Sequence, residues 1–442
     1  MKFIRNNYKY IIIFFMFFFI NVIYNYQNCR WDTMWNYGFS HAIRIGEIVY
    51  RDFNTISTPL YSFIMSLGLF IWDDFLVFLI EHNILVTILF YMIFRMNGKK
   101  GWIIFPTLAL PFFLSFNATY NFFAFFLIVL VILLEKENKN DYLIGLCLGL
   151  IILSKHTIGS VILLMSLIST FDFIKIKKRI IGCLLPISLF MLYLFVTGSF
   201  YNFLDLCIFG LFDFGGSNHF IDKTILIASI VILVILFKKI ITNPKDKYNY
   251  YALGAFSFCI PILDFHHFGY FLSIFTLINI GKIKLSGNYI RNMSILLVIF
   301  VLSMYALMVP NKFNNLSLLN KSHLNYYILK VKEKEHVDKI FLKYKEYKNS
   351  IMLDDNAIVY DLMSNRKITY FDVLLKGNYG YNGTEKMIKK IDDMHEIYFF
   401  VDRKKYLNLD SSEQFDTKVV KHVVEKCEKV DSVSIFDIYY KE

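Results

Sequence analysis

The sequence predicts a polytopic α-helical membrane protein that ends in a small α/β domain. Composition is the first reason, because 56% of the 442 residues are hydrophobic and the mean hydropathy is +0.47; a soluble domain of this length needs more polar surface. The hydrophobic residues also form long runs separated by short segments with Lys or Arg, as in membrane proteins. After Pro310 the sequence becomes charged and contains no run long enough to cross a bilayer.

The basic residues are arranged for a membrane protein rather than for nucleic-acid binding. The chain carries 47 Lys and Arg against 36 Asp and Glu, a net charge of +11, which by itself suits a polyanionic partner. These residues lie in short clusters between the hydrophobic runs, where the positive-inside rule places them. We therefore expect the lipid bilayer as a partner and no nucleic acid.

About eleven hydrophobic runs are candidates for membrane-spanning helices, which need about 20 apolar residues. The first run follows Lys2, Arg5 and Lys9 and lacks the small residues of a cleavage site, so we interpret it as a retained span. The runs are residues 10–26, 75–95, 102–116, 119–135, 141–154, 157–173, 180–197, 223–238, 249–263, 267–281 and 292–309.

One orientation accounts for the charged segments. With the N-terminus in the cytoplasm, every even-numbered run is followed by Lys or Arg, whereas the opposite segments carry Asp, His and Asn. The basic segments are residues 95–100, 135–136, 175–179, 238–239 and 282–284. The sequence thus predicts a multi-pass cell-membrane protein with a membrane domain at residues 1–311, a cytoplasmic N-terminus and an extracytoplasmic C-terminus.

Residues 59–72 are hydrophobic but too few for a span. Counting them as a crossing would invert the charge bias of all later loops. We therefore predict an amphipathic juxtamembrane helix on the outer surface. The first outer loop then covers residues 27–74.

Residues 312–442 are predicted to form an extracytoplasmic α/β domain. Residues 324–348 have helical periodicity with many Lys and Glu, and short apolar runs alternate with helical segments after them. We predict strands at 351–353, 396–401 and 433–439 and helices at 384–394 and 413–427. The glycine-rich residues 377–383 are interpreted as a structural turn and not a nucleotide loop, because no strand leads directly into them.

Ionisable residues on the predicted outer side are the candidates for chemistry. Asp32 follows the first span between Trp31 and Trp35, which suits a carboxylate that acts on a lipid-borne substrate; a solvated loop residue is the alternative. Lys155 and His156 end the short fifth span. Charged groups at membrane depth usually mark function, although Lys155 can also snorkel to the interface.

A second outer cluster contains Asp264, His266 and His267 at the turn after the ninth span. These residue types suit a metal, but adjacent histidines project in different directions. The six cysteines contain no Cys-x-x-Cys pair. We therefore assign no metal ligands and expect no cofactor, and a divalent ion stays an open alternative.

This layout resembles the lipid-dependent GT-C glycosyltransferases, which include protein O-mannosyltransferases, aminoarabinose transferases and oligosaccharyltransferases. Asp32 occupies the place of the acidic motif in the family's first outer loop. Residues 46–53, followed by Pro59-Leu60-Tyr61, are similar to the family's G-x-x-x-Y-x-D segment before a juxtamembrane helix. Residues 146–155 are similar to the G-L-x-L-G-L…K of a middle span, and residues 266–267 to a histidine near a late span.

The resemblance implies transfer of a sugar from a polyprenyl-phosphate donor to a glycan, lipid or protein acceptor at the cell envelope. Phosphate is a stable leaving group, so one carboxylate base suffices, and Asp32 is assigned that role. Cations stabilise charge that develops on the phosphate, while Asp52 orients an arginine or binds sugar hydroxyls. The substrate-binding candidates are Arg44, Arg51, Asp52, Lys155, His156, His266 and His267.

Two other function classes are alternatives. A polysaccharide polymerase or ligase would be expected to have an arginine-rich outer loop in mid-chain, and residues 198–222 contain no Arg. A lipid-linked glycan transporter predicts polar residues within the spans, where this chain is nearly all apolar. Thr33 replaces a second acidic residue of the family and Thr58 a proline, which leaves the subfamily and any metal requirement open.

Overall fold

The computed structural model describes residues 18, 22, 31–98, 117–280, 334–354, 357–407 and 415–442. These residues belong to two compact units. Unit 1 contains Met1–Gln27, Trp72–Met191 and Phe220–Leu316, and unit 2 contains Asn28–Ile71, Leu192–His219 and Ser317–Glu442. The predicted spans 102–116 and 292–309, and all of 10–26 except Phe18 and Val22, lie outside the described residues.

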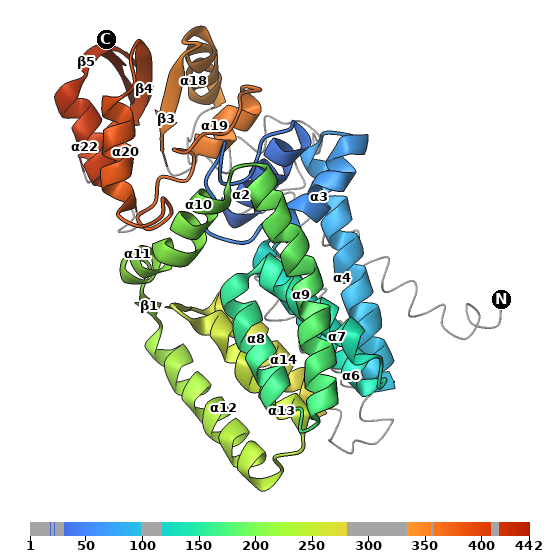
Figure 1. Cartoon of the computed structure of the whole chain (residues 1–442). Coiled ribbons are helices and arrows are strands. Elements are labelled where there is room, and N and C mark those ends of the chain that lie inside the picture. The colour runs from blue at the N-terminus through green and yellow to red at the C-terminus, as the bar shows by residue number, and fades with distance from the viewer. Residues whose placement is uncertain are drawn as a thin grey trace. The chain divides into compact units, whose positions relative to one another are not determined.

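The described part of unit 1 is almost entirely helical (Figure 1). Its two short strands, β1 (Phe220–Ile221) and β2 (Ile262–Leu263), pair in parallel. Its helices are α4 (Phe75–Asn97), α6 (Tyr120–Lys136), α7 (Asp141–Ser154), α8 (His156–Ile168), α9 (Phe173–Val196, to Met191 in this unit), α12 (Lys223–Thr242), α13 (Lys247–Ala255), η3 (Phe256–Cys259) and α14 (Phe265–Ile280).

Three of the described helices, α4, α9 and α12, are long and apolar enough to cross a membrane. They contain 23, 24 and 20 residues, which meets the length that a hydrocarbon core requires. The helices α7 and α8 are also apolar but contain only 14 and 13 residues. The structure is therefore mostly helical and has the helices expected of a membrane-associated protein.

Side-chain caps explain where several of these helices begin. The Asp74 carboxylate accepts a hydrogen bond from the backbone N–H of Leu76 at the start of α4. The Asp222 carboxylate does the same for Thr224 and Ile225 at the start of α12. Such caps satisfy backbone donors that have no partner within the helix.

Glycines of α7 and α9 allow these two helices to approach each other closely. A Cβ atom on Gly145 would lie 2.2 Å from the carbonyl oxygen of Arg179, and one on Gly149 would lie 2.5 Å from that of Cys183. On α9, a Cβ atom on Gly182 would lie 2.2 Å from the carbonyl oxygen of Tyr142. This is the small-residue packing of membrane helices, so two glycines around the 146–155 motif have a packing role.

Unit 2 combines the predicted first outer loop with a later segment and the C-terminal region. Its four-stranded sheet has the order β3-β4-β6-β5, in which only the β3–β4 pair is parallel. Its elements are α2 (Trp31–Arg44), α3 (Leu60–Ile71), α10 (Phe200–Phe203), η2 (Leu204–Phe209), α11 (Gly210–Ser217), α18 (Lys334–Glu346), β3 (Ser350–Leu353), α19 (Ala357–Met363), α20 (Gly383–Asp392), β4 (Ile397–Asp402), α21 (Arg403–Tyr406), α22 (Thr417–Lys426), β5 (Glu428–Val433) and β6 (Phe436–Lys441).

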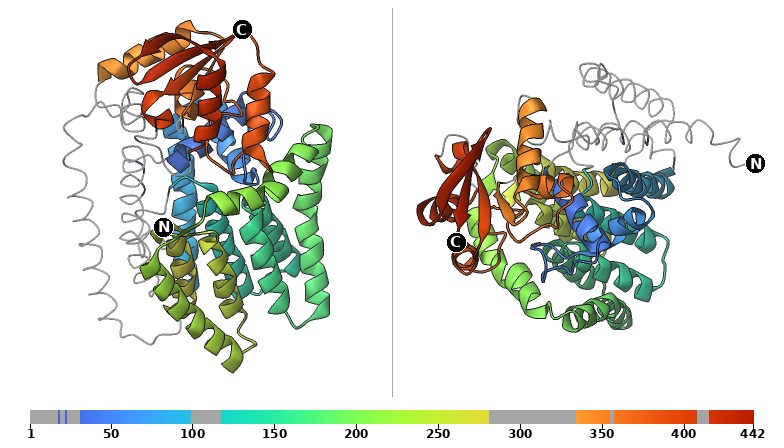
Figure 2. Two further views of the ribbon diagram at one scale, coloured as in Figure 1. Left: turned by 90° about the vertical axis from the view of Figure 1, so that its left-hand side faces the viewer. Right: turned by 90° about the horizontal axis from the view of Figure 1, so that it is seen from above.

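Helices cover both faces of this sheet (Figure 2). Phe399 and Val401 of β4 belong to a hydrophobic core shared with Met387 of α20 and Val420 of α22. On the opposite face, Phe400 packs edge-on against Tyr344 of α18 at 5.0 Å between ring centroids. Successive side chains of a strand point to opposite faces, so the continuous apolar run of β4 reflects burial on both faces.

The structure confirms the predicted strands at 351–353 and 396–401 and helices at 384–394 and 413–427, within a few residues at their ends. The strand predicted at 433–439 is confirmed only in part: β6 covers residues from Phe436 onward, whereas Val433 ends β5, and the two strands form a hairpin that turns at Ser434, whose φ is +53°. Of the helix predicted at 324–348, residues before 334 lie outside the described part.

The glycine-rich residues 377–383 form the predicted structural turn. Gly380 has a φ of +86°, a conformation that glycine adopts without steric cost. A Cβ atom there would also lie 2.5 Å from a carboxylate oxygen of Asp205. Backbone conformation and close packing therefore explain this glycine.

Candidate functional site

Asp32, the predicted catalytic base, lies in the first turn of α2 and not in a loop. Its backbone carbonyl accepts a hydrogen bond of 2.6 Å from the Asn36 amide, and a helix N-terminus favours a negative charge. The helix packs against α3 and α19. Gly38 permits the contact with α19, because a Cβ atom there would lie 2.3 Å from Ile358.

The predicted arginines of the outer loop have different surroundings. Arg44 occupies the last turn of α2. Arg51 forms an ion pair of 2.9 Å with its neighbour Asp52, which also accepts a hydrogen bond of 2.7 Å from the Ile48 N–H. The hydrogen bond from Arg51 lowers the pKa of Asp52. Asp52 is therefore paired with an arginine, and its role in binding a substrate stays a prediction.

Lys155 is the corner residue of a helical hairpin in unit 1. It ends α7 and begins α8, and its φ of −150° breaks the helix. Its ammonium donates a hydrogen bond of 2.7 Å to the Asn121 side-chain oxygen of α6 and lies 5.5 Å from the centroid of the Tyr120 ring. The partners of this half-buried lysine thus include a polar and an aromatic side chain. His156 is the first residue of α8.

Asp264 and His267 form a second polar pair, at the start of α14. The Asp264 carboxylate lies 2.8 Å from Nδ1 of His267 and accepts a hydrogen bond of 2.7 Å from its backbone N–H. Burial alone would raise the pKa of Asp264, but its contacts with His267 lower it to about 2. The His266 ring is perpendicular to that of His267 and packs 5.8 Å from Tyr270.

The structure brings the Lys155 corner and the start of α14 into one neighbourhood of unit 1. Lys155 and Asp264 both lie close enough to Cys259 to act electrostatically on its thiol. The ring of Tyr270, which contacts His266, also packs against Phe125 of α6 at 5.6 Å. We call Asn121, Lys155, Asp264, His266 and His267 the polar cluster of unit 1.

The described residues include no group of three or more His, Cys, Asp or Glu side chains arranged to hold a metal ion. The two adjacent histidines differ in ring orientation by 89°, as expected for neighbouring positions. Asn121 and Lys155 supply an amide and an ammonium, and an ammonium has no lone pair for a cation. Within the polar cluster, Lys155 is therefore the group that can bind an anion, whereas Asp264 carries a negative charge of its own.

Glu47 is a buried carboxylate that we did not single out from the sequence. Its side chain is 3% exposed, and one oxygen lies 3.8 Å from the ammonium of Lys367. Burial raises the pKa of Glu47 from 4.5 to about 7, against the attraction of Lys367 and with help from the nearby Asp52 and Asp361. Its position within the G-x-x-x-Y-x-D segment was the only available signal, since burial is not visible in the sequence.

We expect Glu47→Gln to change how stability depends on pH. The folded protein keeps the proton of Glu47 up to about pH 7, whereas an ordinary glutamate loses it near 4.5. Stability from this group is therefore present at low pH and is lost as pH rises from 4.5 to 7. Unfolding followed from pH 5 to 8 should show wild type losing up to roughly 3 kcal/mol relative to Glu47→Gln. The exposed Glu425→Gln is the control, and equal slopes for all three proteins would contradict the assignment.

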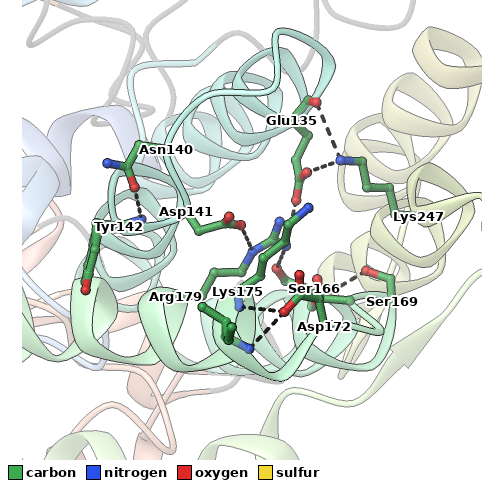
Figure 3. A network of polar contacts seen from close by, with 12 residues as sticks. Glu135, Asn140, Asp141, Tyr142, Ser166, Ser169, Asp172, Lys175, Arg179 and Lys247 are labelled. Atoms are coloured by element: carbon green, nitrogen blue, oxygen red, sulfur yellow. Dashed lines mark hydrogen bonds and ion pairs between the residues drawn. The ribbon is translucent and has the colours of Figure 1, made fainter.

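A network of buried charges joins five helices of unit 1 (Figure 3). Arg179 of α9, 3% exposed, forms ion pairs with Glu135 of α6 at 2.6 Å and with Asp141 of α7 at 2.8 Å. It also donates to the Ser166 hydroxyl of α8, and Lys247 of α13 forms an ion pair with Glu135. The sequence predicts a cytoplasmic loop at 175–179, but the structure places these residues in the first turns of α9.

This network has the properties of a structural element. Its two cations, Arg179 and Lys247, balance its two carboxylates, Glu135 and Asp141. The Tyr251 hydroxyl of α13 donates to Glu135 at 2.8 Å. Buried ions tolerate a low-dielectric environment only when paired and hydrogen-bonded in this way, so we interpret the network as holding the helices together.

Comparison with models of protein families, with curated proteins and with solved structures finds no match to this chain. Function is therefore inferred from the residues of this chain and their geometry.

Proposed function

We propose that this protein is a membrane glycosyltransferase that moves a sugar from a polyprenyl-phosphate donor to an acceptor on the extracytoplasmic face. The acceptor class is a glycan, a lipid or a protein of the cell envelope. The observation that carries the proposal is the polar cluster of unit 1, where the Lys155 ammonium lies at a helix break and, like Asp264 before α14, within electrostatic range of Cys259. A phosphate group at the bilayer surface is a ligand that such an ammonium can bind.

The proposal includes a membrane domain of about eleven spans with the N-terminus in the cytoplasm. The membrane-length helices α4, α9 and α12 support it, as do the shorter helices α6, α7, α8 and α14, which begin within two residues of predicted runs. The 12-residue α3 is too short to span. Its exposed Leu67, Phe70 and Ile71 suit a helix that lies on the outer surface.

The depth of Lys155 is consistent with a lipid-linked ligand. A 14-residue helix such as α7 is about 21 Å long, whereas the hydrocarbon core is about 30 Å thick. If α7 begins at the cytoplasmic surface, its C-terminal corner ends below the opposite surface. A lysine at that depth needs polar partners, and Asn121 supplies one. We propose that the donor phosphate supplies another.

The chemistry requires one base and stabilisation of the departing phosphate. In unit 2, Asp32 removes the proton from the acceptor hydroxyl, which then attacks the anomeric carbon as the bond to the phosphate oxygen breaks. In unit 1, Lys155 and His266 stabilise the negative charge of the phosphate that departs. The energy comes from the sugar–phosphate bond of the donor.

We expect Lys155→Ala to weaken binding of polyprenyl phosphate roughly 10- to 100-fold, the value of a lost charged hydrogen bond. The measurement is a titration of purified protein in nanodiscs with fluorescent polyprenyl phosphate. Lys139→Ala, which removes an exposed lysine at the N-terminal side of α7, is the matched control. Unchanged affinity in a folded Lys155→Ala protein would mean that Lys155 only snorkels and holds the hairpin corner.

A further inference from the structure

The segment α10–η2–α11, residues 200–217, has one strongly apolar exposed face. Tyr201 is 81% exposed and Phe212 is 76% exposed, and Phe209 and Ile208 beside them are also exposed. The segment contains no Lys or Arg. The sequence predicts a short outer loop at residues 198–222, whereas the structure forms helical segments there.

The other face of this segment holds the C-terminal part of unit 2. Asp205 forms an ion pair of 2.6 Å with Lys386, and the Asp213 carboxylate accepts a hydrogen bond of 2.6 Å from the Asn382 N–H. Gly210 packs so closely on Gly380 that a Cβ atom would lie 2.8 Å from its Cα. The polar side chains of this segment thus bond to other residues of unit 2, whereas several of its aromatic side chains are exposed.

The chain connects this segment closely to two membrane-length helices. Three residues separate the end of α9 at Val196 from α10, and five separate α11 from α12. These connections span at most roughly 14 and 22 Å. At the end of α9, Phe195 and Val196 are 62% and 78% exposed and extend the apolar surface of unit 2.

We propose that α10–η2–α11 lies in the interfacial layer of the outer leaflet, with Tyr201, Phe209 and Phe212 in lipid. It thereby anchors the C-terminal part of unit 2 to the membrane surface. Amphipathic helices with aromatic residues bind at this depth. Because the segment has no basic residue, apolar burial drives the contact and anionic lipid is not required. This inference rests on the proposed membrane placement of α9 and α12, and not on the transferase activity.

The test is lipid quenching of a fluorophore on the full chain in phosphatidylcholine vesicles. A nitrobenzoxadiazole label is placed at Phe212→Cys, with Glu425→Cys on the exposed side of α22 and Val231→Cys on the exposed face of α12 as references. Cys29 and Cys427 are replaced by Ser, and the buried Cys147, Cys183, Cys207 and Cys259 remain. A blank without an added cysteine measures background labelling.

We expect the label at 212 to be quenched several-fold more by shallow than by deep doxyl-lipids, and the label at 425 by neither. The label at 231 should be quenched by deep doxyl-lipids. Quenching at 231 without quenching at 212 would overturn this inference while the membrane assignment stands. A label at 212 that is quenched only by a second labelled copy would identify a protein interface instead. Absence of quenching at 231 would overturn the membrane assignment and this inference with it.

Discussion

Asp32→Asn is expected to lower the rate of sugar transfer about 100- to 10,000-fold, the usual contribution of a general base. Asparagine has nearly the same shape but cannot accept the proton of the acceptor hydroxyl. The hydrogen bond from Asn36 uses the backbone carbonyl of residue 32, so the substitution preserves it. A single-turnover assay with preformed donor complex measures the effect on the chemical step.

Donor affinity should be unchanged in Asp32→Asn, and stability should fall by no more than about 1 kcal/mol, the value of a negative charge at a helix N-terminus, which separates loss of a base from loss of folding. Asp73→Asn, which changes a carboxylate outside the predicted site, is the matched control and should transfer sugar at the wild-type rate. If Asp32→Asn retained the wild-type rate, Asp32 would not be the base. Glu47, with a pKa of about 7, would then be the next carboxylate to test.

Arg179→Met is expected to destabilise the protein by about 3–5 kcal/mol, the cost of removing one partner from a buried ion pair. The variant leaves Glu135, 1% exposed, with Lys247 as its remaining cation among the described residues. It also removes the hydrogen bonds that Arg179 donates to Asp141 and Ser166. Thermal unfolding of detergent-solubilised protein measures the loss.

Lys177→Met is the control for this prediction, because Lys177 is an exposed cation on the same helix. It removes the same charge from the same end of α9 without breaking a buried pair, and we expect a change below about 1 kcal/mol. Equal unfolding temperatures for Arg179→Met and Lys177→Met would contradict the structural role of the network.

The sequence predicted helix positions well where hydrophobic runs were bounded by local signals. The single span predicted at 249–263 is wrong, because α13 ends at Ala255 and η3 and β2 follow it. The run at 141–154 coincides with α7, whose N-cap Asn140 and C-cap Lys155 are polar. Capping and periodicity depend on neighbouring residues, so one sequence contains this information. The number of spans stays a prediction, because three predicted runs lie largely or wholly outside the described residues.

Long-range contacts could not be predicted in the same way. Lys177 and Arg179 are both basic residues of the same short segment of the sequence. Lys177 is exposed, whereas Arg179 is buried between carboxylates of α6 and α7. Residues 200–217 contain an irregular helix with a π-helical turn, η2, which disturbs the regular periodicity that identifies a helix. Its polar residues were uninformative because their partners, such as Lys386 for Asp205, are far away in the sequence.

The structure brings some of the predicted site residues close to one another. Lys155 and Asp264 both lie near Cys259 in unit 1, and Arg51 and Asp52 form a pair in unit 2. Placing them on the outer side depended on loop charges, which report topology and not side-chain distance. Burial of Glu47 depends on Lys367 and Asp361 from the C-terminal region, a contact that no local pattern indicates.

The most direct test of the proposed function is a single-turnover assay of purified wild-type protein with a panel of radiolabelled polyprenyl-phosphate sugars. We predict release or transfer of the sugar from at least one donor, and no reaction with nucleotide sugars. Binding of polyprenyl phosphate without turnover would show that the acceptor is missing from the assay. Folded protein that neither binds nor turns over any donor of the panel would contradict the proposal.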